Sequence, residues 1–175
     1  MAGIGRLSTK GSVLLLCDMQ EKFRPTIFQF TNVVSNAARL LQACRILNIP
    51  QILTEQYPKG LGPTVPELGA EGLKPHTKTS FSMMTESVQS SLKSMGDPQQ
   101  VILCGIEAQA CIACTAYDLL ERGMEVHIVA DAVSSRRSRN SWLTPPLIQA
   151  CWPSSALYRA SQTQTTPCRH NYRNY

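Results

Sequence analysis

The sequence predicts an α/β fold, a doubly wound parallel sheet flanked by helices. Three observations support this prediction. Short apolar runs, which are typical of buried strands, alternate with segments whose apolar residues recur at helical spacing. The apolar runs end near polar residues, and Gly and Pro separate many of the elements. The length of 175 residues, 43% of them hydrophobic, suits one well-packed domain better than two.

The first half of the chain predicts two strands, a helix and a long loop. The run VLLLC at 13–17 is apolar throughout, as expected of a central strand that is covered on both faces. The segment 31–49 carries apolar residues at intervals of three and four, so we expect a helix there. The run QILTE at 51–55 predicts a second strand. The segment 56–72 is rich in Pro and Gly and predicts a loop.

The next segments repeat this alternation. The run TKTSFSM at 77–83 is short and favours a strand, and 85–95 predicts a helix with a polar face. The run QVILC at 100–104 predicts another buried strand. The segment 108–123 predicts a helix that Gly123 ends, and MEVHIVAD at 124–131 predicts the following strand. The order of these elements indicates βαβ units and hence a parallel sheet.

Charge and periodicity divide the chain near residue 135. The net charge is +5, but residues 1–135 hold eleven basic and twelve acidic residues and so carry −1. The segment 136–175 holds six arginines and no acidic residue, and no period of 2 or 3.6 persists in it. We therefore predict one domain over 1–135 and an irregular basic tail over 136–175.

The cysteines bear on the compartment. Their number, seven, is odd and their spacing irregular, which does not match the disulfide framework of a small secreted protein. We expect a reducing compartment, the cytoplasm, with the nucleus compatible as well. The N-terminus is basic and free of acidic residues, which leaves a mitochondrial presequence open. No apolar run reaches 18 residues, so we expect no membrane partner.

Three reactive side chains follow or begin predicted elements. Asp18 comes after the first strand, Lys78 begins the third, and Cys111 opens the helix after the fourth. In open parallel sheets, ligands bind beyond the carboxyl ends of the strands. A cysteine in the first turn of a helix faces unpaired N–H groups and the positive end of the dipole, which favours the thiolate. A carboxylate near it could take the thiol proton and later activate water.

Four ordered motifs carry a resemblance to a known family: LLLCDMQEKF, LTEQYPKGLGPTVPEL, TKTSFSM and CGIEAQACI. Together they resemble the isochorismatase-like cysteine hydrolases, particularly the animal type 2 branch, over about residues 10–135. The resemblance implies a Rossmann-like fold and a catalytic triad. In that triad Asp18 would be the acid and base, Lys78 its charge partner and Cys111 the nucleophile.

The resemblance also implies details of the site. The family has a cis peptide before the nucleophile turn, which here would join Ile106 and Glu107. The backbone N–H groups of Glu107 and Cys111 would then form an oxyanion hole. Family members of the nicotinamidase type hold a metal through an Asp/His cluster in the loop after the second strand. That loop has no histidine here, so we expect no metal, and we expect no cofactor either. The expected substrate is a small amide, imide or related acyl compound, and a homo-oligomer is compatible with the family.

Several side chains next to the motifs are candidates for binding the substrate. Phe23, Tyr57 and Phe81 are expected to line the pocket, although they would serve equally well as core aromatics. Glu55 and Gln56 either orient the substrate or order the loop that follows them. The sequence alone does not separate these alternatives.

Other interpretations of the same residues stay open at this point. Cys111 could be a packed thiol, or it could form a redox pair with Cys114, and the protein would then be an inactive interaction or redox module. The arginines of the tail could bind nucleic acid, but they are scattered and no RNA or DNA motif accompanies them, which argues against this partner.

The tail also affects the expected activity. Family members continue after DAVSSR with a helix and a final strand, whereas this chain departs from them after residue 136. We interpret 137–175 as the product of an alternative exon or a shifted reading frame. Without the missing elements, we expect an uncovered sheet face and an open edge beside 124–131, and so an impaired enzyme.

Overall fold

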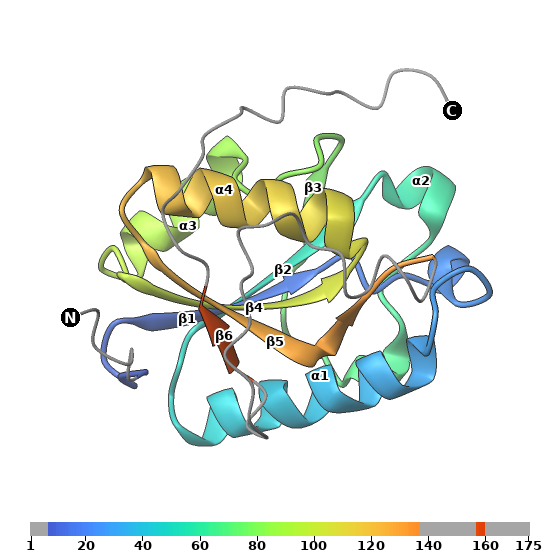
Figure 1. The fold of residues 1–175 in the computed structure, drawn as a ribbon, viewed down its shortest axis with the longest axis horizontal. Helices are drawn as coiled ribbons and strands as arrows, with labels where there is room; N and C mark the ends of the chain where they lie inside the picture. The colour runs from blue at the N-terminus through green and yellow to red at the C-terminus, as the bar shows by residue number, and fades with distance from the viewer. Residues whose placement is uncertain (1–6, 137–156, 160–175) are drawn as a thin grey trace.

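The computed structural model describes residues 7–136 and the backbone of 157–159, and it confirms the Rossmann-like α/β fold (Figure 1). One sheet has the strand order β3-β2-β1-β4-β5-β6. The first five strands run parallel to their neighbours, and β6 runs antiparallel to β5. The strands are β1 (Ser12–Cys17), β2 (Gln51–Gln56), β3 (His76–Lys78), β4 (Gln100–Ile106), β5 (Glu125–Ser134) and β6 (Leu157–Arg159).

Helices lie on both sides of this sheet. Figure 1 shows α1 along one face and α3 and α4 along the other. Every residue of β1 is buried, as expected of a strand covered on both faces. The helices are α1 (Phe30–Ile46), α2 (Pro58–Leu61), α3 (Glu86–Ser94) and α4 (Ala113–Glu121), with short 3-10 turns η1 (Glu21–Phe23) and η2 (Pro66–Leu68) and a π-helical turn η3 (Ala108–Ile112).

The topology identifies where a ligand site belongs. Strands β1 and β4 are neighbours, and the chain leaves β1 toward β2 on one side and β4 toward β5 on the other. In open α/β sheets, ligands bind at this switch point, outside the carboxyl ends of the strands. Asp18 follows β1 and Glu107 follows β4, so both lie at the switch point.

Strand β4 continues past its predicted end because of a close contact with β1. Gly105 pairs with Cys17 in the register of the two strands. A Cβ atom on Gly105 would lie 2.3 Å from the carbonyl oxygen of Cys17, and the φ of Gly105 is +138°. Glycine is the residue that permits both this backbone conformation and this approach. The strand therefore reaches Ile106, directly before the turn that holds Cys111.

Other boundaries differ from prediction in small ways. The predicted loop 56–72 contains α2 and η2, each initiated at a proline that suits the first turn of a helix. The predicted strand 77–83 is regular only to Lys78. The predicted helix 108–123 begins with the π-helical turn η3, which a helical periodicity does not distinguish from an α-helical one.

Most of the basic tail lies outside the described residues, as do residues 1–6. The predicted domain boundary at 135 and the irregular character of 136–175 therefore stay predictions. Strand β6 pairs with β5 at His127, Ile128 and Val129. The expected open edge beside β5 is thus wrong at these three positions, because backbone groups of the tail pair there.

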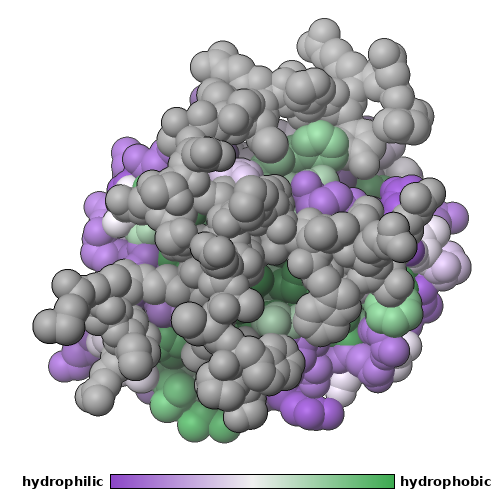
Figure 2. Space-filling view, in the orientation of Figure 1, coloured by the Kyte–Doolittle hydropathy of each residue, from purple (hydrophilic) through white to green (hydrophobic). Residues whose placement is uncertain are grey.

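Part of the surface of the described residues is visible in Figure 2. Figure 2 shows hydrophilic side chains around much of the outline of this face, with separate hydrophobic patches between them. Within residues 7–136 and 157–159, no helix combines the length and apolar character that crossing a membrane requires.

Candidate active site

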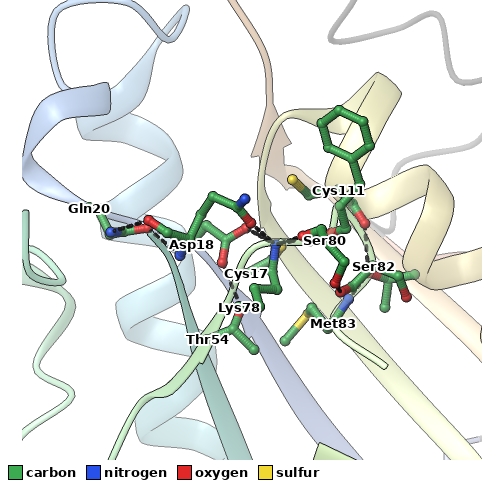
Figure 3. Close-up of polar contacts among 12 residues, drawn as sticks. Cys17, Asp18, Gln20, Thr54, Lys78, Ser80, Ser82, Met83 and Cys111 are labelled. Atoms are coloured by element: carbon green, nitrogen blue, oxygen red, sulfur yellow. Dashed lines mark hydrogen bonds and ion pairs between the residues drawn. The ribbon is translucent and has the colours of Figure 1, made fainter. Parts of the chain in front are cut away.

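The structure brings the three predicted catalytic residues together at the switch point (Figure 3). Asp18 lies just past β1, Lys78 ends β3 and Cys111 lies in η3. The Lys78 Nζ is 2.7 Å from the Asp18 Oδ2, and a carboxylate oxygen of Asp18 lies within 4.8 Å of the Cys111 Sγ. At most 4% of each residue is exposed. A carboxylate, an ammonium group and a thiol thus share one buried cluster.

Asp18 is held by donors on several sides. Its backbone is left-handed, with φ of +53°, a conformation that aspartate tolerates better than most residues. Its Oδ1 accepts a hydrogen bond of 2.7 Å from the Thr54 hydroxyl. Its Oδ2 forms an ion pair with Lys78 and also accepts a hydrogen bond of 3.3 Å from the Cys17 thiol. These contacts fix the orientation of the carboxylate.

Lys78 extends from β3 past β2 to reach Asp18. Its Nζ donates to the Gln56 Oε1 at 2.7 Å and to the carbonyls of Ser80 and Phe81 at 3.1 and 3.0 Å. Burial alone would lower the pKa of Lys78, but the charge of the Asp18 carboxylate outweighs burial and raises it. Lys78 therefore remains an ammonium ion inside the site.

Cys111 is positioned by the irregular start of the helix that follows β4. It is the fourth residue of η3, and π-helical turns occur frequently at functional sites. The Thr115 hydroxyl donates to the Cys111 carbonyl at 2.6 Å and accepts from the Met83 N–H at 3.0 Å. Thr115 thus connects the turn that holds Cys111 to the segment after Lys78.

The predicted cis peptide between Ile106 and Glu107 is wrong. The peptide bonds of the described residues are all trans, and Glu107 makes the turn through a left-handed conformation, with φ and ψ both 59°. The Glu107 carboxylate accepts from the Gln109 amide at 2.9 Å and pairs with Arg136 at 2.8 Å. The oxyanion hole of Glu107 and Cys111 stays a prediction, and both residues lie in this turn.

The predicted substrate-binding residues separate into different environments. Phe23 is buried in the main hydrophobic core, and Phe81 is partly buried against it. Tyr57 is 55% exposed. Gln56 is buried and its side-chain oxygen contacts Lys78. Glu55 accepts hydrogen bonds of 2.7 Å from the N–H and hydroxyl of Thr64, so it orders the loop.

The sequence did not point to Cys17, Thr54 or Gln20 as site residues. Side chains alternate along a strand, so Cys17 and Asp18 would be expected on opposite faces. The left-handed backbone of Asp18 breaks that alternation. The Gln20 side chain accepts from the Gln56 N–H at 2.8 Å and donates to the Gln56 carbonyl at 3.0 Å. It therefore holds the end of β2 against the turn after β1.

The same cluster includes three potential metal ligands, Cys17, Asp18 and Cys111. Thiolates and carboxylates are ligands that zinc accepts. The ammonium group of Lys78 already lies against Asp18, so a divalent cation there would meet a like charge. The arrangement suits thiol chemistry better than metal binding.

Comparisons with known proteins place this geometry in context. Residues 12–142 match the Isochorismatase domain. The chain is 62% identical over 133 residues to isochorismatase domain-containing protein 2 of Xenopus laevis. This alignment covers 76% of this chain and 65% of that protein. The chain thus spans just under two thirds of the length of that curated relative.

Two solved structures extend the comparison. The MAR1 ribonuclease of Caenorhabditis elegans is 50% identical with a TM-score of 0.71, covering 78% of this chain and 71% of that one. The YcaC protein of Escherichia coli, an octameric hydrolase of unknown specificity, is 23% identical with a TM-score of 0.72. This match covers 81% of this chain and 72% of that one. The second comparison supports the fold alone.

Proposed function

Because the chain belongs to the isochorismatase domain family, we propose that it is a cysteine hydrolase acting on a small amide, imide or related acyl compound. The observation that carries this proposal is the buried Asp18 carboxylate, which pairs with Lys78 and lies within 4.8 Å of the Cys111 Sγ. A thiol next to a fixed carboxylate is the arrangement that nucleophilic catalysis requires.

The proposed reaction uses these residues in two halves. Asp18 takes the thiol proton as the Cys111 sulfur attacks the carbonyl carbon, and the N–H groups of Glu107 and Cys111 bind the resulting oxyanion. The protonated Asp18 then gives its proton to the leaving nitrogen, and an acyl thioester forms. Asp18 next takes a proton from water as the water oxygen attacks the thioester carbon. The C–S bond then breaks, the acid leaves, and Asp18 returns the proton to the Cys111 sulfur. Lys78 holds Asp18 in place throughout, and none of the steps requires a metal or an organic cofactor.

A substrate panel with a nucleophile variant tests this proposal. The full chain is incubated with small primary amides and cyclic imides, and release of ammonia or acid is measured. Cys111→Ser should lower the rate by about 10³-fold or more, because serine is far less acidic than cysteine. Cys114→Ser, at a buried position in α4, is the matched control and should keep most of the activity. Equal loss in both variants, or none in Cys111→Ser, would contradict the assignment.

Thiol labelling tests the same site without a substrate. Iodoacetamide at neutral pH should alkylate Cys111 faster than Cys44 or Cys104, as followed by peptide mass spectrometry. Burial raises the pKa of Cys44 to about 11 and also raises the pKa of Cys104, so neither forms thiolate at pH 7. Similar rates at all three positions in a chain that melts cooperatively would rule out an activated Cys111.

Tyr57 provides a prediction on specificity. The side chain is exposed beside the site end of β2, so Tyr57→Ala should change substrate preference while leaving the free energy of unfolding nearly unchanged. The measurement is kcat/KM across the panel together with a urea titration. Tyr57→Phe is the control, since it keeps the ring. A loss of stability without a kinetic change would assign Tyr57 a structural role.

A second candidate function is cleavage of RNA, because the Caenorhabditis elegans protein that is 50% identical is a ribonuclease. Phosphate contacts make RNA binding strongly dependent on salt. A labelled single-stranded RNA is therefore added to the panel at low and high salt. Cleavage that Cys111→Ser abolishes would favour this candidate over amide hydrolysis.

We also propose that this chain forms a homo-oligomer, as its resemblance to the family implies. YcaC, which shares the fold at 23% identity, is octameric. Light scattering of the purified full chain measures its oligomeric state directly.

A further inference from the structure

A second thiol lies beside the proposed nucleophile. The Sγ atom of Cys17 is within 4.8 Å of the Cys111 Sγ, and the Asp18 carboxylate lies within the same distance of both. Cys17 belongs to β1 and Cys111 to η3, so residues far apart in the sequence bring the two sulfurs together. Figure 3 shows both residues in the same cluster as Asp18 and Lys78.

The hydrolysis steps above leave this thiol without a role. Cys17 is fully buried and its thiol donates to the Asp18 Oδ2 at 3.3 Å. Burial, then a hydrogen bond to Cys111 and the charge of Asp18, raise the pKa of Cys17 well above its ordinary value. Cys17 is therefore a protonated thiol at neutral pH, with a base already in contact with its proton.

We propose that Cys17 and Cys111 form a modification site: when a peroxide oxidises Cys111, Cys17 resolves the product into a reversible disulfide. The site depends on the reactive Cys111 of the proposed function, but it needs no substrate. Oxidation would block the nucleophile, and reduction would restore it.

The chemistry balances in two steps. Asp18 takes the Cys111 thiol proton as the sulfur attacks one oxygen of hydrogen peroxide. The O–O bond breaks, Cys111 becomes a sulfenic acid, and the leaving hydroxide takes that proton from Asp18 to form water. Cys17 then attacks the Cys111 sulfur as Asp18 takes the Cys17 proton. The S–O bond breaks, and hydroxide leaves with that proton as a second water. Two thiols and one peroxide thus give one disulfide and two waters.

The structure favours this pairing for geometric reasons. A disulfide requires the sulfurs to approach to about 2.05 Å, and the two Sγ atoms already lie within 4.8 Å of each other, so the movement that the bond needs is local. Cys111 lies in a π-helical turn, a rare local structure that occurs frequently at functional sites. Cys114, the alternative redox partner, is buried in α4 outside the three-residue cluster.

Peptide mapping of the oxidised full chain tests the proposal. The protein is treated with hydrogen peroxide, remaining thiols are alkylated, and tryptic peptides are analysed without reduction. Trypsin places Cys17 in peptide 11–22 and Cys111 in peptide 94–122. We expect these two peptides to be joined by one bond, which fragmentation assigns to Cys111. The joined species should disappear after dithiothreitol, with recovery of rapid alkylation at Cys111.

Two variants test which cysteine forms the disulfide with Cys111. Cys17→Ser should abolish the joined peptide and increase sulfinic acid at Cys111 severalfold, because nothing then intercepts the sulfenic acid. Cys114→Ser should leave the joined peptide unchanged. Sulfinic acid at Cys111 of the wild type without the joined peptide, or a disulfide within peptide 94–122, would overturn the proposal.

Alkylation rates distinguish a failure of the proposed disulfide from a failure of the proposed active site. If Cys111 is alkylated quickly but no crosslink forms, the proposed nucleophile stands and the resolving role of Cys17 is wrong. If Cys111 is alkylated no faster than Cys44, the reactive site itself is wrong.

Discussion

Gly105→Ala is expected to destabilise the protein by about 2–6 kcal/mol, the sum of an overpacking cost and a strained backbone. A Cβ atom at this position would lie 2.3 Å from the carbonyl oxygen and 2.6 Å from the Cβ of Cys17. The obstructing atoms belong largely to the backbone of the adjacent central strand, which cannot move aside without breaking the β1–β4 ladder. Urea denaturation followed by far-UV circular dichroism measures the loss.

Gly123→Ala is the matched control for this experiment. Gly123 also has a positive φ, of +75°, but a Cβ there would meet nothing within 4 Å. Alanine at 123 should therefore cost about 1 kcal/mol, from backbone strain alone. If both substitutions lower the free energy of unfolding equally, the close approach of β4 to Cys17 adds nothing to the effect of Gly105→Ala. The proposed reason for glycine at position 105 would then be wrong.

Lys78→Met is expected to destabilise the protein by about 3–5 kcal/mol and to abolish hydrolysis. The substitution keeps an unbranched side chain but leaves the buried Asp18 carboxylate without its ammonium partner. Arg24 provides a contrast, because it pairs with Glu21 and Glu67 on the surface, where ion pairs contribute little. Arg24→Met should therefore change the urea midpoint much less than Lys78→Met.

The pH dependence of stability gives an independent check on Lys78. Its pKa is raised in the folded protein, because the charge of Asp18 outweighs the effect of burial. This contribution is therefore fully present below the pKa of an unfolded lysine, about 10.4, and is lost as pH rises through the folded value. The stability difference between wild type and Lys78→Met should shrink above about pH 10.4. A constant difference across that range would show that Lys78 acts through packing and not through its charge.

The parallel sheet and the identity of its strands could be predicted from the sequence. The apolar runs at 13–17 and 100–104 match the central strands β1 and β4 because both faces of each are covered, which leaves a continuous hydrophobic signal. Asp18, Lys78 and Cys111 converge because parallel strands direct their carboxyl ends to one edge. The resemblance to the family assigned these three residues to one site, which their spacing in the sequence alone does not do.

The remaining site features depend on contacts that a linear pattern does not encode. Thr54 reaches Asp18 through the register of β1 and β2, in which Cys17 lies beside Thr54. Cys17 joins the site because the left-handed backbone of Asp18 interrupts strand alternation. The π-helical turn at Cys111 has the same apolar pattern as an α-helix, so periodicity predicted a regular helix there.

The position of Lys78 also has a consequence for local opening. Strand β3 has three residues and lies at the end of the sheet, where short strands ordinarily fray and exchange their amide hydrogens quickly. Here Lys78, the last residue of β3, pairs with the buried Asp18, so separating this strand from the sheet would break a buried ion pair. The Tyr57 N–H, which donates to the Lys78 carbonyl at 2.9 Å, should therefore exchange only when the protein unfolds globally. The buried Lys78 cation should thereby make the edge of the sheet part of the same cooperative unit as its core.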